Sequence, residues 1–337
     1  MIYLGCMSFS RAFSRIDRFL GAILLTVAFA SVLPARGQAA TVAGSLTDAA
    51  VMLLFFMHGA RLSPEAALAG ARHWRLHAIV FFSTFALFPL LVVTCRLLAP
   101  TLLPPPLWAG LILLSALPST IQASIAFTSI AGGNVSAALC SASASNLLGT
   151  VLAPLIVGVL LASGAPLSVH SVLAIVLQLL VPFLAGQLLR PLIGGFISRH
   201  GLALKCVDCG SILLIVYTAF SEGVVNGIWH QVDAAQLLRL ALINATLLAI
   251  VMTALTIASR RLGFSRADEI TIVFCGSKKS LATGVSIATV LFAGHVGLAI
   301  MPIMLFHQIQ LMVCASLARR YASRREVTDP IVIKATA

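Results

Sequence analysis

Long runs of apolar residues alternate with short segments that hold most of the charged and turn-forming residues. A helix needs about 20 mostly apolar residues to cross a hydrocarbon core of about 30 Å, and most of the runs have roughly this length. We therefore expect an all-α membrane protein with ten transmembrane helices joined by short loops. Their approximate limits are residues 19–33, 45–62, 74–98, 107–131, 135–162, 167–189, 206–225, 234–258, 267–292 and 296–318.

The composition also predicts a polytopic membrane protein. Of the 337 residues, 60% are hydrophobic and 9% are charged, and the mean hydropathy is +1.05. A soluble domain would carry roughly a quarter charged residues. The seven cysteines are odd in number and lie mostly in apolar runs, which argues against a disulfide framework. The close pair Cys206 and Cys209 is a weak metal or redox signal, because no histidines or second pair accompany it.

The basic residues predict the orientation of the chain. Lys and Arg number 22 against 10 Asp and Glu, a net charge of +12, and in a membrane protein such an excess marks cytoplasmic loops rather than nucleic-acid binding. With ten helices and a cytoplasmic N-terminus, Arg36, Arg96 and Arg239 fall outside. We expect a multi-pass protein of the cell membrane, inner or plasma, with both termini in the cytoplasm. The inside residues would be Arg11, Arg15, Arg18, Arg61, Arg72, Arg75, Arg190, Arg199, Lys205, Arg260, Arg261, Arg266, Arg319, Arg320, Arg324, Arg325 and Lys334.

The ten helices divide into two halves of five. An odd number per half gives the halves opposite orientations, and the fourth helix of each half is interrupted by Pro, Gly or charged residues. Paired interruptions of this kind point to a transport site at the interface of inverted repeats. We expect a cytoplasmic tail over 1–18, a first repeat over 19–163, an inverted second repeat over 164–320 and a cytoplasmic tail over 321–337. A cleaved secretory signal is the alternative for the first run.

The fourth run is interrupted at Pro118. Proline removes a backbone donor and clashes with the carbonyl four residues earlier, which frees carbonyl groups. Polar side chains follow at Ser119, Thr120, Gln122 and Ser124. A kinked helix whose hydroxyls bond their own backbone is the structural alternative to a binding site.

The ninth run carries Lys278 and Lys279 near its middle, between Ser277 and Ser280. Two charges facing lipid there would cost several kcal/mol, so we expect them to face a wet cavity, a partner or a ligand. Three interpretations remain open. The lysines could hold an anionic substrate, stand where another transporter keeps a sodium ion, or bond freed carbonyls as a structural pair, and one could be structural while the other functions.

Two further helices carry candidate polar residues. In the fifth run, Ser141, Ser143 and Asn146 form an oxygen-rich strip suited to a hard cation such as sodium, although small residues also serve close packing. In the tenth run, His307 and Gln310 share one face, and the histidine is either a satisfied packing residue or a group that shuttles protons or contacts substrate. The candidate substrate and ion residues are Ser119, Thr120, Gln122, Ser124, Asn134, Ser141, Ser143, Asn146, Ser277, Lys278, Lys279, Ser280, His307 and Gln310, with a sodium ion expected near Ser124, Ser143 and Asn146.

The sequence contains no recognisable motif for enzyme catalysis. There is no G-x-S-x-G elbow, no His/Cys metal spacing and no phosphate-binding loop, and no carboxylate lies at either interruption. We therefore expect no catalytic residue and no cofactor other than a coupling sodium ion.

The segments 55–63, 118–134, 141–146, 274–284 and 306–310 resemble the bile acid:sodium symporter family, in the SBF-like branch that includes the sodium/bile acid cotransporter 7 type. The resemblance covers nearly the whole chain. It implies ten helices in two inverted five-helix repeats, with helices one, two, six and seven as a panel and the others as a core in which helices four and nine cross where they break. It also implies organic-anion substrates and sodium as the co-ion.

The chain departs from the family pattern at the ninth helix. Sodium symporters of the family place a Glu and a Gln around the break, where this chain has Phe274 and Lys278, aligned on Gly276. Ser124 matches the family serine of the fourth helix, followed by Ile125 rather than Asn. Replacing an anionic ligand and adding an ammonium group weakens a cluster of sodium sites by repulsion.

We therefore expect a secondary active transporter, symporter-like, that moves an organic anion by alternating access. A sodium-independent or proton-coupled carrier and a non-transporting membrane regulator with the same fold are the alternatives. The expected partners are the lipid bilayer and a small organic-anion substrate, without nucleic acid.

Overall fold

The computed structural model describes residues 21–23, 25–61, 73–161, 169–225, 227, 233–292 and 296–328. These residues are almost entirely helical, and no strand occurs among them, so the expected all-α class is confirmed. Residues 21–23 and 25–32 form a first helical segment. The elements that follow are α2 (Gln38–Arg61), α4 (Trp74–Phe82), η2 (Ser83–Leu87), α5 (Phe88–Leu98), η3 (Pro100–Leu102), α6 (Pro105–Ala116), α7 (Ile121–Ile130), α8 (Val135–Leu161), α9 (Val169–Arg199), α10 (Gly201–Val225), α12 (Ala234–Arg261), α13 (Arg266–Gly276), α14 (Leu281–Leu291) and α15 (Val296–Thr328).

Six helical segments in the described parts of the chain are long and apolar enough to cross a membrane. A seventh is added if α6 and α7, which bend by 61° at their break, form one span. This establishes a multi-pass membrane protein. The ten-helix count and the inverted repeat stay predictions. The candidate spans are Gln38–Met57, Trp74–Leu98, Val135–Leu161, Cys206–Val225, Ala234–Arg261 and Val296–Ser323.

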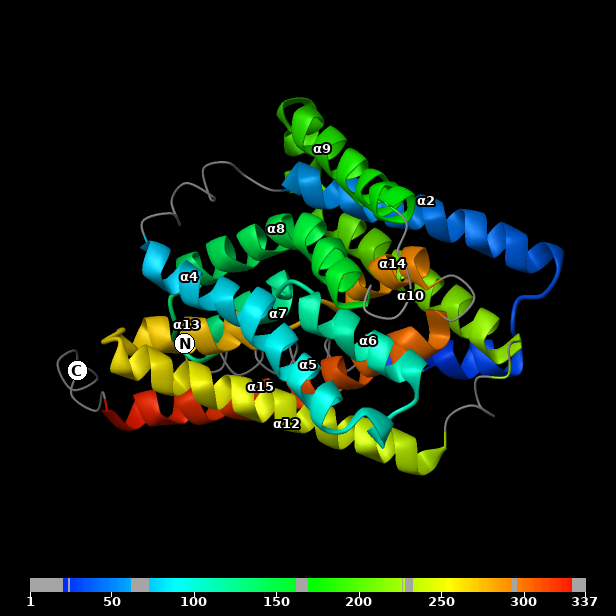
Figure 1. The fold of residues 1–337 in the computed structure, drawn as a ribbon. Coiled ribbons are helices and arrows are strands. Elements are labelled where there is room, and N and C mark those ends of the chain that lie inside the picture. Colours follow the sequence, from blue (N-terminus) through cyan, green and yellow to red (C-terminus); the bar gives the residue numbers. More distant parts are fainter. Residues whose placement is uncertain are drawn as a thin grey trace.

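The helices form a core flanked by α2 and α9 (Figure 1). In that view α12 and α15 run side by side along the lower edge, while α2 and α9 lie against each other at the upper edge. α10 contacts both α2 and α15 and therefore lies between the two groups. The arrangement places α6, α7, α13 and α14 in the interior, where their breaks meet.

α2 and α9 approach each other closely because each carries a glycine at the contact. A Cβ atom at Gly59 would collide with the backbone carbonyl oxygen of Phe183, and one at Gly186 would collide with that of Phe56. Glycines at such positions let two helix backbones come together. The contact is reciprocal, so α2 and α9 pack as a unit through Gly59 and Gly186.

Both expected interruptions are breaks in the structure. α6 ends at Ala116 and α7 begins at Ile121, with Leu117 and Thr120 in extended conformations. α13 ends at Gly276 and α14 begins at Leu281. Gly284 lies inside α14, and its missing side chain makes room for Leu117, since a Cβ would lie 2.5 Å from the Leu117 Cδ1 atom.

Two helices extend beyond the apolar runs. α9 continues past residue 189 to Arg199, and α15 continues past residue 320 to Thr328. The added part of α15 contains no Pro or Gly, so it can stay helical in water, whereas the added part of α9 is helical although it contains Pro191 and two glycines. Part of the expected C-terminal tail is therefore helical. The expected N-terminal tail, residues 1–18, lies outside the described residues.

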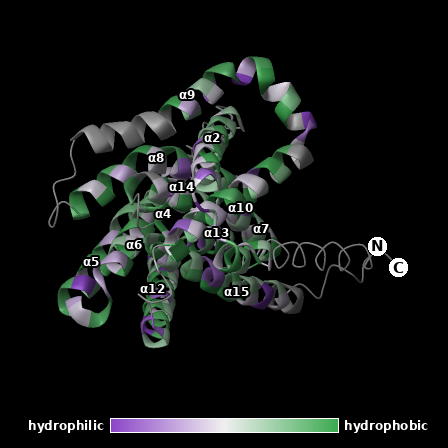
Figure 2. Ribbon diagram, turned by 90° about the vertical axis from the view of Figure 1, so that its right-hand side faces the viewer, coloured by the Kyte–Doolittle hydropathy of each residue, from purple (hydrophilic) through white to green (hydrophobic). Residues whose placement is uncertain are grey.

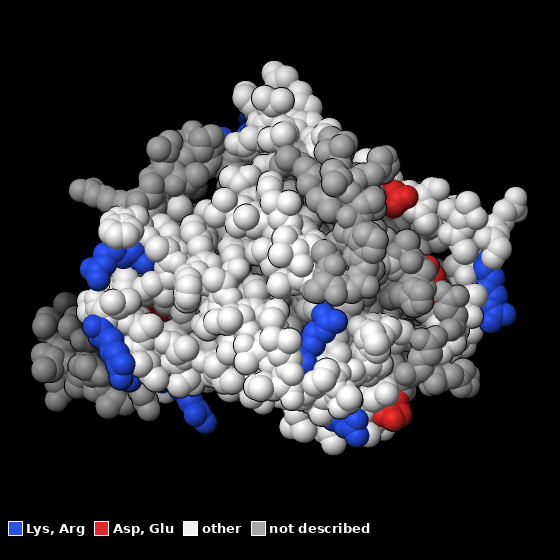
Figure 3. Space-filling model, in the orientation of Figure 1, with Lys and Arg blue, Asp and Glu red and all other residues white. Residues whose placement is uncertain are grey.

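The surface matches a lipid environment. Large apolar side chains such as Leu98 and Leu188 are about four-fifths exposed, at 81% and 79%, and apolar residues cover most of the helices (Figure 2). The face in Figure 3 is mostly uncharged, with Lys and Arg at its left and right ends and a few near its centre and lower edge. Uncharged side chains thus cover most of this face, as expected of a surface in contact with lipid.

At one end, three of the arginines predicted to share the cytoplasmic side lie on neighbouring helix ends. Arg75 donates to the carbonyl of Leu262 at 3.2 Å. Arg260 and Arg266 both bind the Glu269 carboxylate, at 3.1 and 2.7 Å. The start of α4, the end of α12 and the start of α13 therefore meet at one side of the protein.

Candidate functional site

The two breaks contact each other directly. The backbone N–H of Ser280 donates to the carbonyl of Pro118 at 2.9 Å, and the hydroxyl of Thr120 donates to the carbonyl of Lys279 at 2.9 Å. Each break thus satisfies a backbone carbonyl of the other, which matters because an unpaired buried carbonyl is costly. The crossing of the interrupted helices is built from these reciprocal bonds.

Lys279 is saturated by backbone carbonyls. Its ammonium group donates to the carbonyls of Thr84 at 2.7 Å, Ser115 at 2.6 Å and Leu117 at 2.9 Å. An ammonium group has three donors, so no proton of this group is left for a substrate. The nitrogen also lies 4.2 Å from the centroid of the Phe88 ring, a cation–π contact. This geometry matches the structural interpretation for Lys279.

Two of these carbonyls, those of Thr84 and Ser115, are free for identifiable reasons. Thr84 lies in the π-helical segment η2, where the N–H of Phe88 bonds Ser83 rather than Thr84, and the following residue, Pro89, has no N–H. The carbonyl of Ser115 is free because the N–H of Ser119, four residues on, donates to the Ser145 hydroxyl instead. The last turn of α6 thus presents its negative end to a cation.

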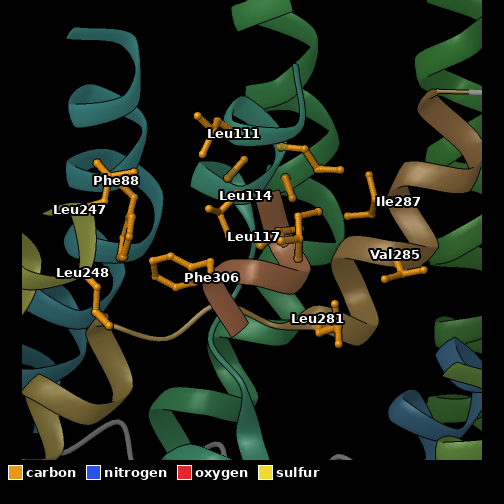
Figure 4. Close-up of a cluster of buried hydrophobic side chains, with 14 of the residues drawn as sticks. Phe88, Leu111, Leu114, Leu117, Leu247, Leu248, Leu281, Val285, Ile287 and Phe306 are labelled. Atoms are coloured by element: carbon orange, nitrogen blue, oxygen red, sulfur yellow. The ribbon is translucent and has the colours of Figure 1, made fainter. Parts of the chain in front are cut away.

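Apolar side chains enclose this ammonium group. Phe88 and Phe306 meet edge to face with centroids 5.9 Å apart. Figure 4 shows them facing each other near Leu114 and Leu117. In such a dry setting a hydrogen bond from a charged group is stronger than in water, so Lys279 ties η2, α6 and the break before α14 together.

Lys278 has a different environment. Its side chain is fully buried, and its ammonium group donates to the carbonyl of Phe274 at a long 3.3 Å. The nitrogen lies 4.6 Å from the centroid of the Phe127 ring and 4.5 Å from that of Phe274. The thiol of Cys314 is also within hydrogen-bonding reach. Lys278 is therefore held by aromatic faces and one weak oxygen contact, and of the two lysines it has the weaker oxygen coordination.

Polar side chains of α7, α8 and α14 form a chain of contacts beside Lys278. The Ser124 hydroxyl lies 3.2 Å from that of Ser119 and donates to the Phe274 carbonyl at 3.4 Å. The Asn146 amide donates to the Ser119 carbonyl at 2.6 Å and accepts from the Thr283 hydroxyl at 3.4 Å. These contacts connect the region predicted to favour sodium with the break that carries the lysines.

Gln310 fixes the backbone of Lys279. Its side-chain oxygen accepts the N–H of Lys279 at 2.9 Å, and its side-chain nitrogen donates to the carbonyl of the same residue at 3.0 Å. The same nitrogen lies 2.8 Å from Nδ1 of His307. The pair expected on one face of the tenth helix thus joins the crossing.

Other predicted site residues lie apart from this group. Gln122 is exposed, and Ser141 bonds His77 on α4 at 2.6 Å. Asn134, after the predicted turn, bonds Asp268 at 3.0 Å and so joins the α7–α8 turn to the start of α13. Ser143 is half-buried on α8, one turn before Asn146.

Several residues of the site were not expected. Thr84, Phe88, Phe127 and Thr283 all contact it, and Phe127 and Thr283 lie within segments that the sequence had marked. In a regular α-helix Pro89 would free the carbonyl of Phe85, so only the π-helical bonding of η2 makes Thr84 the free one. Among the described residues, no group of three or more His, Cys, Asp or Glu side chains is placed to hold a metal ion.

Comparisons with known proteins point to one family. Residues 17–323 match the model of the SBF-like CPA transporter family. The chain is 53% identical to "Uncharacterized protein PA2026" of Pseudomonas aeruginosa over 92% of this chain and 94% of that protein. It is 52% identical to "Putative symporter YfeH" of Escherichia coli K12, over 94% and 96%, and 27% identical to "Sodium/bile acid cotransporter 7" of Xenopus tropicalis, over 88% and 89%. The chain therefore belongs to the SBF-like CPA transporter family, a family of transporters and not of enzymes.

Proposed function

We propose that this protein is a secondary active transporter that moves a small organic anion by alternating access. The observation that carries the proposal is the crossing of two broken helices, with Thr120 bonded to Lys279 and Ser280 bonded to Pro118. Discontinuous helices that meet inside a membrane protein are typical of the binding sites of secondary transporters.

Ten crossings in two inverted repeats, over residues 19–163 and 164–320, form part of the proposal. The two breaks support it, because one spans residues 117–120 and the other residues 277–280. Thr120 and Ser280, each directly before the second half-helix, have nearly the same backbone angles, φ −80° and ψ 118° against φ −81° and ψ 113°. Matching breaks in two halves of a chain are the expected mark of such a repeat.

An organic anion fits the charge at the crossing. The N-termini of α7 and α14 both begin at the breaks, and helix N-termini carry partial positive charge. Lys278 adds a buried ammonium group with one long oxygen contact, to the Phe274 carbonyl. The sodium/bile acid cotransporters among the relatives agree with an anionic, partly apolar substrate.

The test is uptake of radiolabelled taurocholate, followed by a panel of other organic anions, into proteoliposomes that contain the purified protein. Thr120→Val removes the hydroxyl that joins the breaks and should reduce uptake at least about tenfold, since small displacements at a site have large effects on rate. Thr256→Val is the matched control, because the Thr256 hydroxyl bonds only its own helix, at the Met252 carbonyl. Absence of uptake for every anion by folded protein would favour a membrane regulator instead.

A carrier without sodium coupling is the second candidate, and the surroundings of Lys278 favour it. Its ammonium group and the Phe274 ring occupy the two positions where the family's sodium symporters have Gln and Glu, and they lie against each other. A fixed positive charge beside Ser124 opposes a sodium ion there by Coulomb repulsion. Uptake that is unchanged when choline replaces sodium would support this candidate, whereas strict sodium dependence would exclude it.

A further inference from the structure

The orientation of the Gln310 side chain is determined by two backbone groups. The N–H of Lys279 can only donate, so the atom 2.9 Å from it is the amide oxygen. The carbonyl of Lys279 can only accept, so the atom 3.0 Å from it is the amide nitrogen. Both constraints give the same orientation.

This orientation determines the protonation of His307. The Gln310 nitrogen, which can only donate, lies 2.8 Å from Nδ1 of the imidazole. Nδ1 must therefore accept, and it carries no hydrogen. In the structure His307 is a neutral imidazole with its proton on Nε2.

We propose that His307 and Gln310 form a proton-binding site that controls the break between α13 and α14. A proton that binds Nδ1 turns the acceptor into a donor, and two donors then face each other at 2.8 Å. The Gln310 amide must rotate away, and the N–H of Lys279 loses its acceptor. The inference rests on the proposed transport function in one respect, because it makes the proton the coupling ion of that carrier.

The rearrangement has an acceptor for the new N–H. The Gln310 nitrogen lies 2.8 Å from Nδ1 and 3.0 Å from the carbonyl oxygen of Lys279, so when the amide rotates away this oxygen is the acceptor for the new N–H. The proton is taken from water on one side of the membrane and returned on the other. No bond other than N–H is made or broken.

The charged groups around His307 explain why this conformation holds the neutral form. Lys278 directly precedes the residue whose backbone Gln310 binds, and its positive charge opposes a second one on the imidazole. The helices α6, α7 and α14 that pack against α15 carry no titratable side chain. Protonation of His307 therefore favours a rearranged crossing. A proton that binds the rearranged conformation more tightly than this one shifts the protein toward it, and this difference in affinity is the basis of coupling. On the other two neighbours the charged or acidic groups are Arg239, Arg260 and Arg261 of α12, and Lys205, Asp208 and Glu222 of α10.

Hydrogen–deuterium exchange of the full-length protein in lipid nanodiscs tests the proposal without a substrate. Peptides that cover residues 277–281 are followed between about pH 4 and about pH 8, a range that includes histidine titration, with correction for the intrinsic pH dependence of exchange. In the wild type we expect a step toward faster exchange at low pH, about tenfold for the loss of one hydrogen bond. His307→Gln keeps an acceptor for Gln310 but cannot titrate, so the step should disappear.

Two further variants make the test specific. His77→Gln alters another buried histidine, bonded to Ser141 on a different helix, and should keep the step. Gln310→Glu places an acceptor opposite Nδ1, so protonation no longer creates two facing donors and the Lys279 N–H keeps its acceptor. The step should therefore disappear in this variant. If His307→Gln fails to fold, this variant tests whether the step depends on the contact between His307 and Gln310.

A step that persists in His307→Gln, or a flat profile in the wild type, overturns the proposal. The readout is independent of transport. A protein that shows the step but takes up no anion therefore contradicts the proposed function and supports the proton site. A protein that takes up taurocholate but shows a flat exchange profile supports the proposed function and contradicts the proton site.

Discussion

The ammonium nitrogen of Lys278 lies 4.5 Å from the centroid of the Phe274 ring, one helical turn earlier in the chain. These two residues are the positions at which the chain departs from the Glu and Gln of the family's sodium symporters. Their contact shows that the two departures form one unit, in which an aromatic face stabilises the introduced charge. The neighbouring Lys279 has no part in this unit, because carbonyls use all three of its protons.

Lys278→Met should abolish anion uptake without loss of stability. Methionine keeps most of the aliphatic volume and removes a buried charge whose contact with the Phe274 carbonyl oxygen is 3.3 Å long. Replacing a poorly paired buried charge by an apolar side chain is often neutral or stabilising. Taurocholate uptake into proteoliposomes should fall at least about tenfold, because about 1.4 kcal/mol of lost attraction corresponds to that factor. Normal uptake by this variant would exclude Lys278 from the site.

Lys279→Met should instead destabilise the protein. It leaves the carbonyls of Thr84, Ser115 and Leu117 buried without their donor, and such a loss costs about 2 to 5 kcal/mol. A thermal unfolding curve in detergent should show a clearly lower midpoint than that of Lys278→Met, which is the matched control. Equal midpoints for the two variants would contradict the structural role of Lys279.

Gly59→Ala and Gly186→Ala should each weaken the contact between α2 and α9. The added Cβ atom would collide with a backbone carbonyl oxygen of the facing helix, and a backbone cannot move aside as a flexible side chain can. We expect each variant to lower the thermal midpoint. The controls are Gly44→Ala in α2 and Gly195→Ala in α9, whose Cβ atoms would meet nothing within 4 Å and which should gain up to about 1 kcal/mol from helix propensity.

Reporter fusions test the proposed orientation. Alkaline phosphatase, which is active only outside the cytoplasm, should be active after residue 103 and inactive after residue 263, because the basic residues around Leu262 mark the inside. Arg75, Arg260 and Arg266 lie together at that end of the protein. The opposite pattern would invert the topology, and activity at both positions would contradict the five spans expected between them.

The sequence predicted much of the site but did not assign roles within it. Pro118 and the run from Ser277 to Ser280 marked both breaks. Proline interrupts a helix, and charged residues inside an apolar run are costly unless they bind a partner or face a cavity. The grouping of Asn146, His307 and Gln310 with the breaks was also expected. Gln122 and Asn134 were grouped with them on sequence proximity alone, yet one is exposed and the other binds Asp268.

By itself the sequence determined the membrane class, the helical elements and the positions of the breaks, since apolar runs and local backbone chemistry decide these within a few residues. Only the tertiary structure decided which lysine is structural. The carbonyls that bind Lys279 include those of Thr84 and Ser115, 195 and 164 residues away in the chain. The Thr84 carbonyl is free because of a π-helical turn, which the residue types do not predict. Hydrogen-bond partners of a buried charge depend on which chain segments meet in space, and that is a property of the packed fold.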